Sequence, residues 1–260
     1  MGSSYPQNSV PAVHRAIDVI EYISSAQREV SLSELMENLD IPRQSLFRIL
    51  NTLFDRGFLD KSSQRGLYRI GLKFLYLGQG LPGKFELRKA AWDEMKALSQ
   101  KTKKTIELSS LDRDQLILLE QIPGTEDVTH YARAGSVIPY LHTVSVGKVY
   151  LAQMDAAKRQ RVLGKIGLPA MTRYTITDMD RLEEEIRITQ ERGYGFEDQE
   201  LREGVRRVAA PVFNAGGKLE GCIGLSAPIF SFSLDDVDRY GRMVREAADK
   251  ASQALGYKPN

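Results

Sequence analysis

The stretch SLSELMENLDIPRQSLFRILNTLFDRGFLDKSSQRGLYRI, Ser31 to Ile70, predicts a short helix, a tight turn, a longer helix and two strands joined by a polar turn. At 100° per residue, the longer helix, from Arg43 to Arg56, divides into two faces. One face is apolar and carries Leu46, Leu50, Leu53 and Phe54, flanked by Phe47 and Ile49. The other face is polar and carries Gln44, Ser45, Arg48, Asn51 and Thr52. Such a helix buries one face and offers the other to a groove, which predicts a winged helix-turn-helix that reads DNA.

Local signals mark where these elements begin and end. Ser31 and Glu34 have the spacing of a capping box at the start of the short helix. Pro42 suits the first turn of the next helix, and Gly57 suits a left-handed position just after its end. A preceding amphipathic helix is predicted from Val13 to Ser25.

Charge is distributed unevenly, although the net charge of the whole chain is +2. Residues 11–40 carry a net charge of −4. Residues 41–73 carry seven Arg and Lys against two Asp, a net charge of +5. The positive charge therefore lies in the predicted recognition helix and wing, where DNA phosphates would bind.

Composition is that of a globular protein large enough for two domains: 260 residues, 42% hydrophobic and 27% charged. No apolar run approaches the roughly 18 residues of a membrane span, and the first residues lack the pattern of a secretory signal. The lone cysteine, Cys222, fits a reducing cytoplasm. Because the three histidines have no metal-ligand spacing, we expect no metal, and we expect no cofactor.

A glycine- and proline-rich stretch, Gly78 to Gly83, predicts the joint between two domains. It also matches G-x-G-x-x-G, but no βαβ unit surrounds it, so a dinucleotide site is rejected. The expected organisation is a DNA-binding domain at 9–72, a linker helix and joint at 73–84, and an effector-binding and oligomerisation domain at 85–257. In the last part, strands interleaved with helices predict an α+β fold with an antiparallel sheet. The expected strands are 105–111, 115–122, 128–132, 194–198, 207–213 and 219–227.

Several stretches, spread over nearly the whole chain, resemble the IclR family of bacterial transcriptional regulators. They are Val13-His-Arg-Ala-Ile17, Ile41-Pro-Arg-Gln-Ser-Leu-Phe-Arg-Ile-Leu50, Tyr68-Arg-Ile-Gly71, Leu141-His-Thr-Val-Ser-Val-Gly-Lys148, Gly193-Tyr-Gly-Phe-Glu-Asp-Gln-Glu200, Val208-Ala-Ala-Pro-Val212 and Ile223-Gly-Leu-Ser-Ala-Pro228. The resemblance implies a winged helix-turn-helix joined by a linker helix to a GAF-like effector domain. It also implies a cytoplasmic homodimer or homotetramer on palindromic double-stranded DNA operators, rather than an enzyme or a membrane protein.

On the DNA-binding domain, the candidate DNA contacts are Arg43, Gln44, Ser45, Arg48, Thr52 and Arg65. Gln44 can read adenine, and Arg48 or Arg43 can read guanine in the major groove. Ser45 suits a phosphate, and Arg65 in the wing turn suits the backbone or the adjacent minor groove. The alternative for Arg48 is an internal ion pair with Asp55 or Glu34.

In the second domain, family members bind small carboxylates, and by resemblance the site falls on Val128, Tyr131, Pro139, Ser145, Val146, Glu197, Arg207, Gly224 and Ser226. The first backbone amides of the helix starting at Ser145 would receive the anion. Arg207 departs from the family, in which smaller residues are common there. It could face inward, paired with Glu197 or with the ligand, or form a surface pair with Arg206. We hypothesise an aromatic or other cyclic carboxylic acid as effector.

Two enzymatic readings and one further regulatory reading stay open. Ser145-x-x-Lys148 matches the S-x-x-K of penicillin-binding enzymes, although its companion motifs are absent, so a hydrolase with an accessory DNA-binding domain is the alternative function. His142 and Cys222 suggest a Cys–His pair, but packing roles are favoured. The third possibility is a DNA-bound regulator that has lost control by a ligand.

Overall fold

The computed structural model describes residues 9–62, 66–78, 84–126, 132–138 and 140–258. The chain divides into two compact units, Met1–Pro82 and Gly83–Asn260, each with its own core. Separate cores are what independent folding units require.

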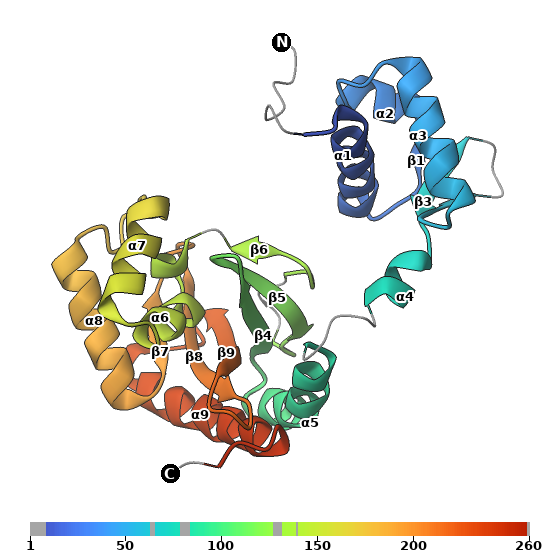
Figure 1. The fold of residues 1–260 in the computed structure, drawn as a ribbon. Coiled ribbons are helices and arrows are strands. Elements are labelled where there is room, and N and C mark those ends of the chain that lie inside the picture. The colour runs from blue at the N-terminus through green and yellow to red at the C-terminus, as the bar shows by residue number, and fades with distance from the viewer. Residues whose placement is uncertain (1–8, 63–65, 79–83, 127–131, 139, 259–260) are drawn as a thin grey trace. The chain divides into compact units, whose positions relative to one another are not determined.

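The first unit is a winged helix-turn-helix, which confirms the predicted class (Figure 1). Its strands form an antiparallel sheet in the order β1-β3-β2. The elements are α1 Pro11–Ala26, β1 Val30–Ser31, α2 Leu32–Asn38, α3 Arg43–Asp55, β2 Leu59–Lys61, β3 Leu67–Ile70 and α4 Lys73–Gly78. Strand β1 was not predicted, because two residues that pair only with a distant strand carry no local periodicity.

Most of the predicted end signals are seen in this unit, with two differences. The Glu34 carboxylate bonds Arg28 instead of completing the predicted capping box, and Pro42 is the N-cap of α3 rather than part of its first turn. The Ser31 hydroxyl accepts the amide of Glu34 at 3.1 Å, and Ser31 is the N-cap of α2. Gly57 has φ +75°, the left-handed conformation after α3. Pro42 occupies the N-cap of α3, and its carbonyl accepts the amide of Leu46 at 2.9 Å. These contacts satisfy backbone groups that helix ends leave unpaired.

The buried face of α3 differs from the predicted one at two aromatic residues. Leu46, Ile49, Leu50 and Leu53 are buried as the helical period requires, with the flanking Ile49 among them. Phe47 is 52% exposed and Phe54 is 37% exposed, so their expected burial was wrong. The Lys61 ammonium lies 4.3 Å from the centre of the Phe54 ring, in cation–π geometry.

The second unit is a six-stranded antiparallel sheet in the order β6-β5-β4-β9-β8-β7, with helices on both faces (Figure 1). The strands are β4 Thr105–Asp112, β5 Gln115–Ile122, β6 Val137–Ile138, β7 Gly195–Asp198, β8 Val205–Phe213 and β9 Leu219–Pro228. The helices are α5 Lys84–Thr102, η1 Leu141–Thr143, α6 Ser145–Ala152, α7 Ala156–Ile166, α8 Met179–Arg192, η2 Leu234–Asp236 and α9 Val237–Ala254. This arrangement confirms the predicted α+β class.

Alternating residues of the central strands supply two cores. Val208, Ala210 and Ile223 pack with α5 and α9, whereas Ala209 and Cys222 pack with α6, α7 and α8. The period of two along a strand sends neighbours to opposite faces. The strand expected at 128–132 lies outside the described residues except for Ala132, which is in no strand, and the described neighbour of β5 is β6.

Two glycines leave room for close contacts of helix α6, Gly195 with strand β7 and Gly147 with the preceding η1. A Cβ on Gly195 would overlap the carbonyl oxygen of Ser145, and a Cβ on Gly147 would overlap the carbonyl of Leu141. All residues of α6 are buried. The height of this helix above the sheet is therefore set by the absence of side chains at its contact points.

We expect Gly195→Ala to lower the free energy of unfolding of the second unit by about 2 kcal/mol, because the new methyl group must displace packed backbone. Urea unfolding followed by the fluorescence of Trp92, which lies in α5, measures this change. The matched control is Gly164→Ala in α7, where an added Cβ has open space. It should raise stability by about 0.5–1 kcal/mol. An unchanged urea midpoint for Gly195→Ala would contradict the close packing.

Candidate nucleic-acid interface and ligand cavity

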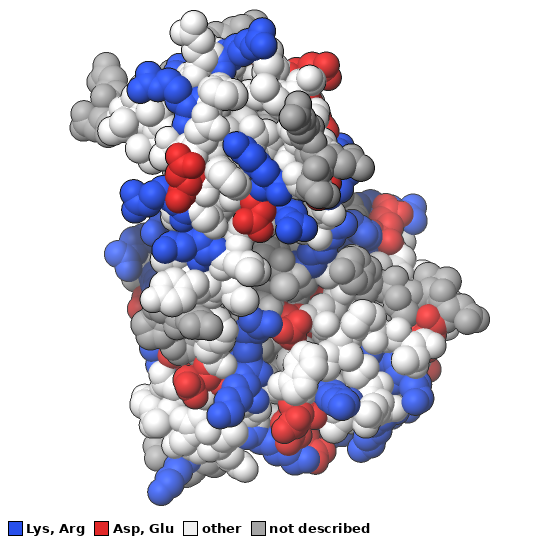
Figure 2. Space-filling model, turned by 90° about the vertical axis from the view of Figure 1, so that its right-hand side faces the viewer, with Lys and Arg blue, Asp and Glu red and all other residues white. Residues whose placement is uncertain are grey.

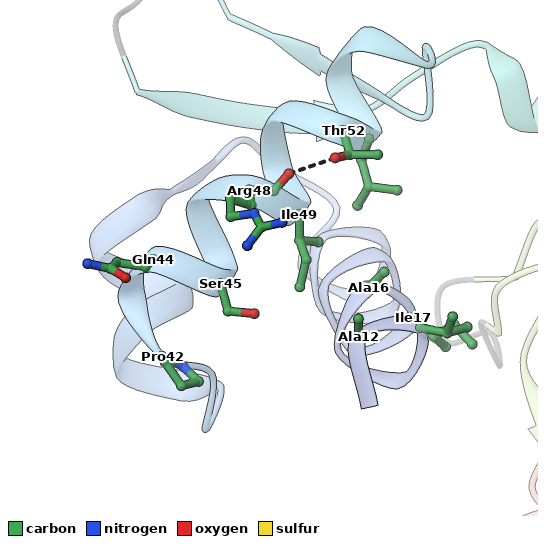
Figure 3. A pocket seen from close by; sticks show the side chains of 11 residues that line it. Ala12, Ala16, Ile17, Pro42, Gln44, Ser45, Arg48, Ile49 and Thr52 are labelled. Atoms are coloured by element: carbon green, nitrogen blue, oxygen red, sulfur yellow. Dashed lines mark hydrogen bonds between the residues drawn. The ribbon is translucent and has the colours of Figure 1, made fainter. Parts of the chain in front are cut away.

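A groove of about 640 Å³ runs between α1 and α3 of the first unit (Figure 3). Helix α1 contributes small and apolar residues: Ala12, Val13, Ala16 and Ile17. Helix α3 contributes the predicted polar face, namely Gln44, Ser45, Arg48 and Thr52, together with Ile49 and Leu53, and its N-cap Pro42 also lines the groove. Gln44, Arg48, Thr52 and the neighbouring Arg43 are exposed, and Ser45 is half-buried. The candidate DNA contacts of the helix thus share one accessible face.

Arg48 forms no ion pair within the described residues. The predicted alternative partner Glu34 instead accepts Arg28 at 2.6 and 2.9 Å, and accepts the Tyr22 hydroxyl at 3.2 Å. Hydrogen bonding to Arg28 lowers the pKa of Glu34. The guanidinium of Arg48 is therefore available to an outside acceptor such as guanine.

Thr52 is less available as a donor than its exposure indicates. Its hydroxyl donates to the Arg48 carbonyl at 2.8 Å, the dashed line in Figure 3. A hydroxyl that already donates its hydrogen can still accept a hydrogen bond. It cannot also donate to a phosphate oxygen, which needs a donor. Arg65, the candidate in the wing turn, lies outside the described residues.

On the face shown in Figure 2, Lys and Arg side chains are interspersed with Asp and Glu and do not gather into one area. Within the first unit, Arg43, Arg48, Arg56, Lys61, Arg69 and Lys73 are exposed. The case for DNA binding therefore rests on the motif and its local charge.

The second unit contains a cavity of about 520 Å³ between the sheet, α6 and surface loops. Its apolar lining consists of Leu118, Ala132, Ile138, Val144, Val146, Met171 and Leu201. Its polar lining consists of Glu107, Ser109, Arg133, Ser136, Arg202 and Arg207. A mostly apolar wall with a few converging polar groups is typical of small-molecule sites.

Arg207 faces inward and is paired within the protein. Its side chain is 7% exposed, and its Nη1 lies 2.7 Å from Oε2 of Glu197, which is fully buried. Burial alone would lower the pKa of Arg207, but the carboxylates of Glu197 and Glu107 outweigh it and raise that pKa. Arg206 points elsewhere and bonds Asp198 at 2.8 Å and the Phe232 carbonyl at 2.7 Å. Of the two predicted orientations of Arg207, the structure has the buried one.

The predicted effector residues divide into lining and supporting positions. Val146 and Arg207 line the cavity. Glu197 accepts a hydrogen bond from Arg207. Gly224 lies next to the side chain of Val146, since a Cβ added to Gly224 would be 3.9 Å from it. Ser226 is paired in register with Arg207, and Ser145 begins α6. Val128, Tyr131 and Pro139 lie outside the described residues.

Sequence reasoning missed five polar lining residues: Glu107, Ser109, Arg133, Ser136 and Arg202. Glu107 and Ser109 alternate with the apolar Ile106 and Leu108 on β4, so polar side chains on one face of a central strand were a readable signal. Arg133 and Arg202 lie in loops and gave no such signal.

Two serine hydroxyls near this region, Ser145 Oγ and Ser226 Oγ, are buried and have no hydrogen-bond partner among the described residues. Buried hydroxyls normally have partners, so these two are exceptions. Both belong to the predicted effector set.

The enzymatic readings find no support in the side-chain geometry. Lys148 Nζ donates to the Phe196 carbonyl at 2.9 Å and to Glu200 at 2.6 Å, and not to Ser145. Burial raises the pKa of the Cys222 thiol, which disfavours the thiolate. His142 contacts the Pro169 carbonyl at 3.1 Å, and burial lowers its pKa. In the described part of the chain, no cluster of three His, Cys, Asp or Glu could hold a metal ion.

Lys148 and Glu200 form a second buried ion pair, next to the cavity wall. Glu185 lies 3.8 Å from the Lys148 ammonium, and one oxygen of Glu200 has no hydrogen-bond partner within the described residues. Burial raises the pKa of Glu200 to about 7, although Lys148 acts against that rise. Glu200 therefore changes charge near neutral pH.

We expect the stability of the second unit to fall between about pH 5 and pH 8 because of Glu200. The unfolded state releases the Glu200 proton near the ordinary pKa of 4.5, whereas the folded state keeps it up to about pH 7. The contribution of protonated Glu200 to stability is therefore complete below about pH 4.5 and is lost as pH rises through about 7. The effect is at most about 3 kcal/mol. Melting temperatures of Glu200→Gln should depend less on pH. The control, Glu203→Gln, removes a 54% exposed carboxylate from the same loop and should keep the wild-type slope. Equal slopes for wild type and Glu200→Gln would refute the assignment.

Comparison with known proteins agrees with both units. The sequence model for the "Bacterial transcriptional regulator IclR C-terminal" domain matches residues 82–253, and that for the "IclR helix-turn-helix domain" matches residues 12–63. The chain is 29% identical over 250 residues to the HTH-type transcriptional regulator KdgR of Escherichia coli, covering 96% of this chain and 94% of that protein. It is 27% identical to the E. coli transcriptional repressor IclR, covering 95% and 90%.

Solved structures give the same picture of the fold. An IclR transcriptional regulator from Alicyclobacillus acidocaldarius has a TM-score of 0.78 at 27% identity, covering 95% of this chain and 100% of that one. An IclR homologue from Microbacterium hydrocarbonoxydans, complexed with 4-hydroxybenzoate, has a TM-score of 0.82 at 22% identity, covering 94% and 98%. No described helix is long and apolar enough to cross a membrane.

Proposed function

This chain belongs to the IclR family of bacterial transcriptional regulators, and we propose that it switches its DNA binding in response to a small organic carboxylic acid. The observation that carries the proposal is the 520 Å³ cavity, which combines an apolar wall with three arginines. Arginine is the side chain best suited to bind carboxylates, and an apolar wall suits the carbon skeleton. The fourth charged lining residue is Glu107.

The apolar wall favours an aromatic or other cyclic acid. Val144, Val146, Leu118 and Ile138 offer branched side chains that can cover a flat ring. Val144 is the N-cap of α6 and Val146 lies in its first turn, so the free amides at the start of this helix belong to the same wall. We propose that they support the carboxylate, with Ser145 and Ser226 as nearby hydroxyls and Val128, Tyr131 and Pro139 completing the site.

In the first unit, we propose that Gln44 and Arg48 read bases in the major groove while Arg43, Ser45 and Arg65 contact the backbone. Thr52 would accept a bond rather than donate one, because its hydrogen is already used. The protein would act in the cytoplasm without catalysis, as a homodimer or homotetramer on a palindromic operator whose half-sites lie about 34 Å, or a multiple, apart. The ligand would shift the population between two arrangements of the DNA-binding units.

The DNA contacts predict distinct mutant behaviours. Gln44→Ala should relax preference at one base pair, and Arg48→Ala should weaken the selected site by about 1–3 kcal/mol. Arg65→Ala should weaken binding to all sequences and lower the salt slope by about one. Sites selected from a random duplex library, then titrated by fluorescence anisotropy at several salt concentrations, measure all three.

Arg56→Ala is the control, because Arg56 is at the C-cap of α3, away from the groove. Unchanged affinity, preference and salt slope for the three variants would refute the DNA-binding assignment. Wild-type binding that no organic acid alters would instead support a regulator without ligand control.

The two exposed arginines that line the cavity, Arg133 and Arg202, lead us to expect a loss of ligand binding when either is removed. A thermal-shift screen of organic acids should find compounds that stabilise the wild type, and Arg133→Ala or Arg202→Ala should weaken the best of them about tenfold. Arg161→Ala removes an exposed arginine from α7, outside the cavity, and should behave as wild type. Equal stabilisation of all four proteins by the best acid would place its site elsewhere.

A further inference from the structure

An aromatic side chain, Phe47, lies on the accessible part of helix α3. It is in the first two turns of that helix and is 52% exposed. At 100° per residue, it flanks Gln44 on the side opposite Ser45 and Thr52, which line the groove between α1 and α3. The surface that this helix can offer to DNA therefore includes a phenyl ring beside its polar groups.

The ring of Phe47 is not used by the core of the first unit. It is not among the buried and half-buried side chains that form that core. Within the described residues, no second aromatic ring and no cation lies against it. Phe54, the other exposed phenylalanine of α3, differs, because the Lys61 ammonium lies 4.3 Å from the centre of its ring. Phe47 therefore keeps its exposed apolar surface for a partner outside this unit.

The neighbours of Phe47 suit the surface of a DNA duplex. Arg43 and Gln44 lie one turn before it and Arg48 follows it, and all three are exposed. The first turn of α3 contains no acidic residue, and the first one along the helix is Asp55. Phosphates can therefore approach this end of the helix without repulsion from a nearby carboxylate. In helix-turn-helix proteins, it is the N-terminal part of the recognition helix that meets base edges, and Phe47 lies in that part.

The major groove presents a methyl group at one base only. Thymine carries it at C5, whereas the edges of adenine, guanine and cytosine present hydrogen-bond donors and acceptors. A phenyl ring against a polar edge removes water without replacing its hydrogen bonds, which costs free energy. Against the thymine methyl group, the same ring buries apolar surface that both partners expose beforehand, which is favourable. An exposed phenylalanine in the groove therefore discriminates in favour of thymine.

We propose that Phe47 contacts the C5 methyl group of a thymine in the major groove and selects thymine at that position of each half-site. This inference rests on the proposed binding of DNA by α3, and it adds an apolar specificity-determining residue to the polar contacts. Side chains three residues apart on a helix have Cβ atoms about 5–6 Å apart, and base pairs follow one another about every 3.4 Å. The thymine therefore lies within about two base pairs of the pair that Gln44 reads.

The test removes the methyl group from the DNA and the ring from the protein. In one half-site of the operator selected from the random library, each thymine is replaced in turn by deoxyuridine. Deoxyuridine lacks only the C5 methyl group and keeps every hydrogen-bonding group of thymine. Fluorescence anisotropy with the full-length wild type should show that affinity falls about fivefold at the contacted thymine and is unchanged at thymines outside the reach of the ring.

Phe47→Ala should bind the thymine operator more weakly than the wild type and should no longer distinguish thymine from deoxyuridine at that position. Phe47→Gln, which keeps a long side chain with good helix propensity, is a second variant with the same expected loss of discrimination. The control is Phe54→Ala, which removes the other exposed phenylalanine of α3, the one that Lys61 covers. It should keep the wild-type ratio of the two affinities. Circular dichroism verifies that the variants are folded.

Each outcome separates the inference from the function on which it rests. If no deoxyuridine weakens binding of the wild type, the inference is overturned and selective DNA binding by α3 stands. The same holds if the Phe47 variants lose as much affinity as the wild type at the same thymine, or if that thymine is remote from the pair at which Gln44→Ala relaxes preference. If the wild type selects no sequence from the library, the proposed DNA binding is overturned and this inference with it.

Discussion

The contact between α6 and the sheet is the constraint on which the ligand site depends. The helix can lie this low because Gly195 has no side chain under the Ser145 carbonyl and Ala209 and Gly224 are small. At this height, Val144 and Val146 become a wall of the cavity instead of the underside of a distant helix. Larger residues at these strand positions would raise α6 and open the wall, because a close-packed interior has no spare volume.

The second determinant is how the buried charges are compensated. Removing a charge from water costs several kcal/mol, and a partner with good geometry is needed to offset it. Glu197 serves this purpose for Arg207, and it also accepts the amides of Glu200 at 2.6 Å and Leu201 at 3.2 Å. One carboxylate therefore connects Arg207, which lines the cavity, to the loop that carries Leu201 and Arg202.

In the first unit, the energetics are simpler and more local. An apolar core from α1, α3 and the wing holds α3, and the polar face of that helix stays accessible. Glu34 of α2 pairs with Arg28, two residues before β1, and is therefore not the partner of Arg48. The two aromatic residues that were expected to be buried, Phe47 and Phe54, show the limit of a helical wheel. A wheel gives the direction of a side chain, but it does not say how far the neighbouring element extends to cover it.

The sequence by itself determined most of the elements, their order, the fold class and the polar face of α3, because these follow from periodicity, capping residues and glycines that act within a few positions. The two-residue strands β1 and β6 were not predicted. It also identified Arg207 and Glu197 as possible partners, since they lie on adjacent strands close in the chain. The tertiary structure alone decided that Glu107 lines the same cavity as Arg207, 100 residues away. It also decided that Arg133 and Arg202 line this cavity, whereas Ser145 and Glu197 lie behind its lining. Such juxtapositions depend on strand order and register, which arise from the packing of the whole sheet and leave no mark on the residues nearby.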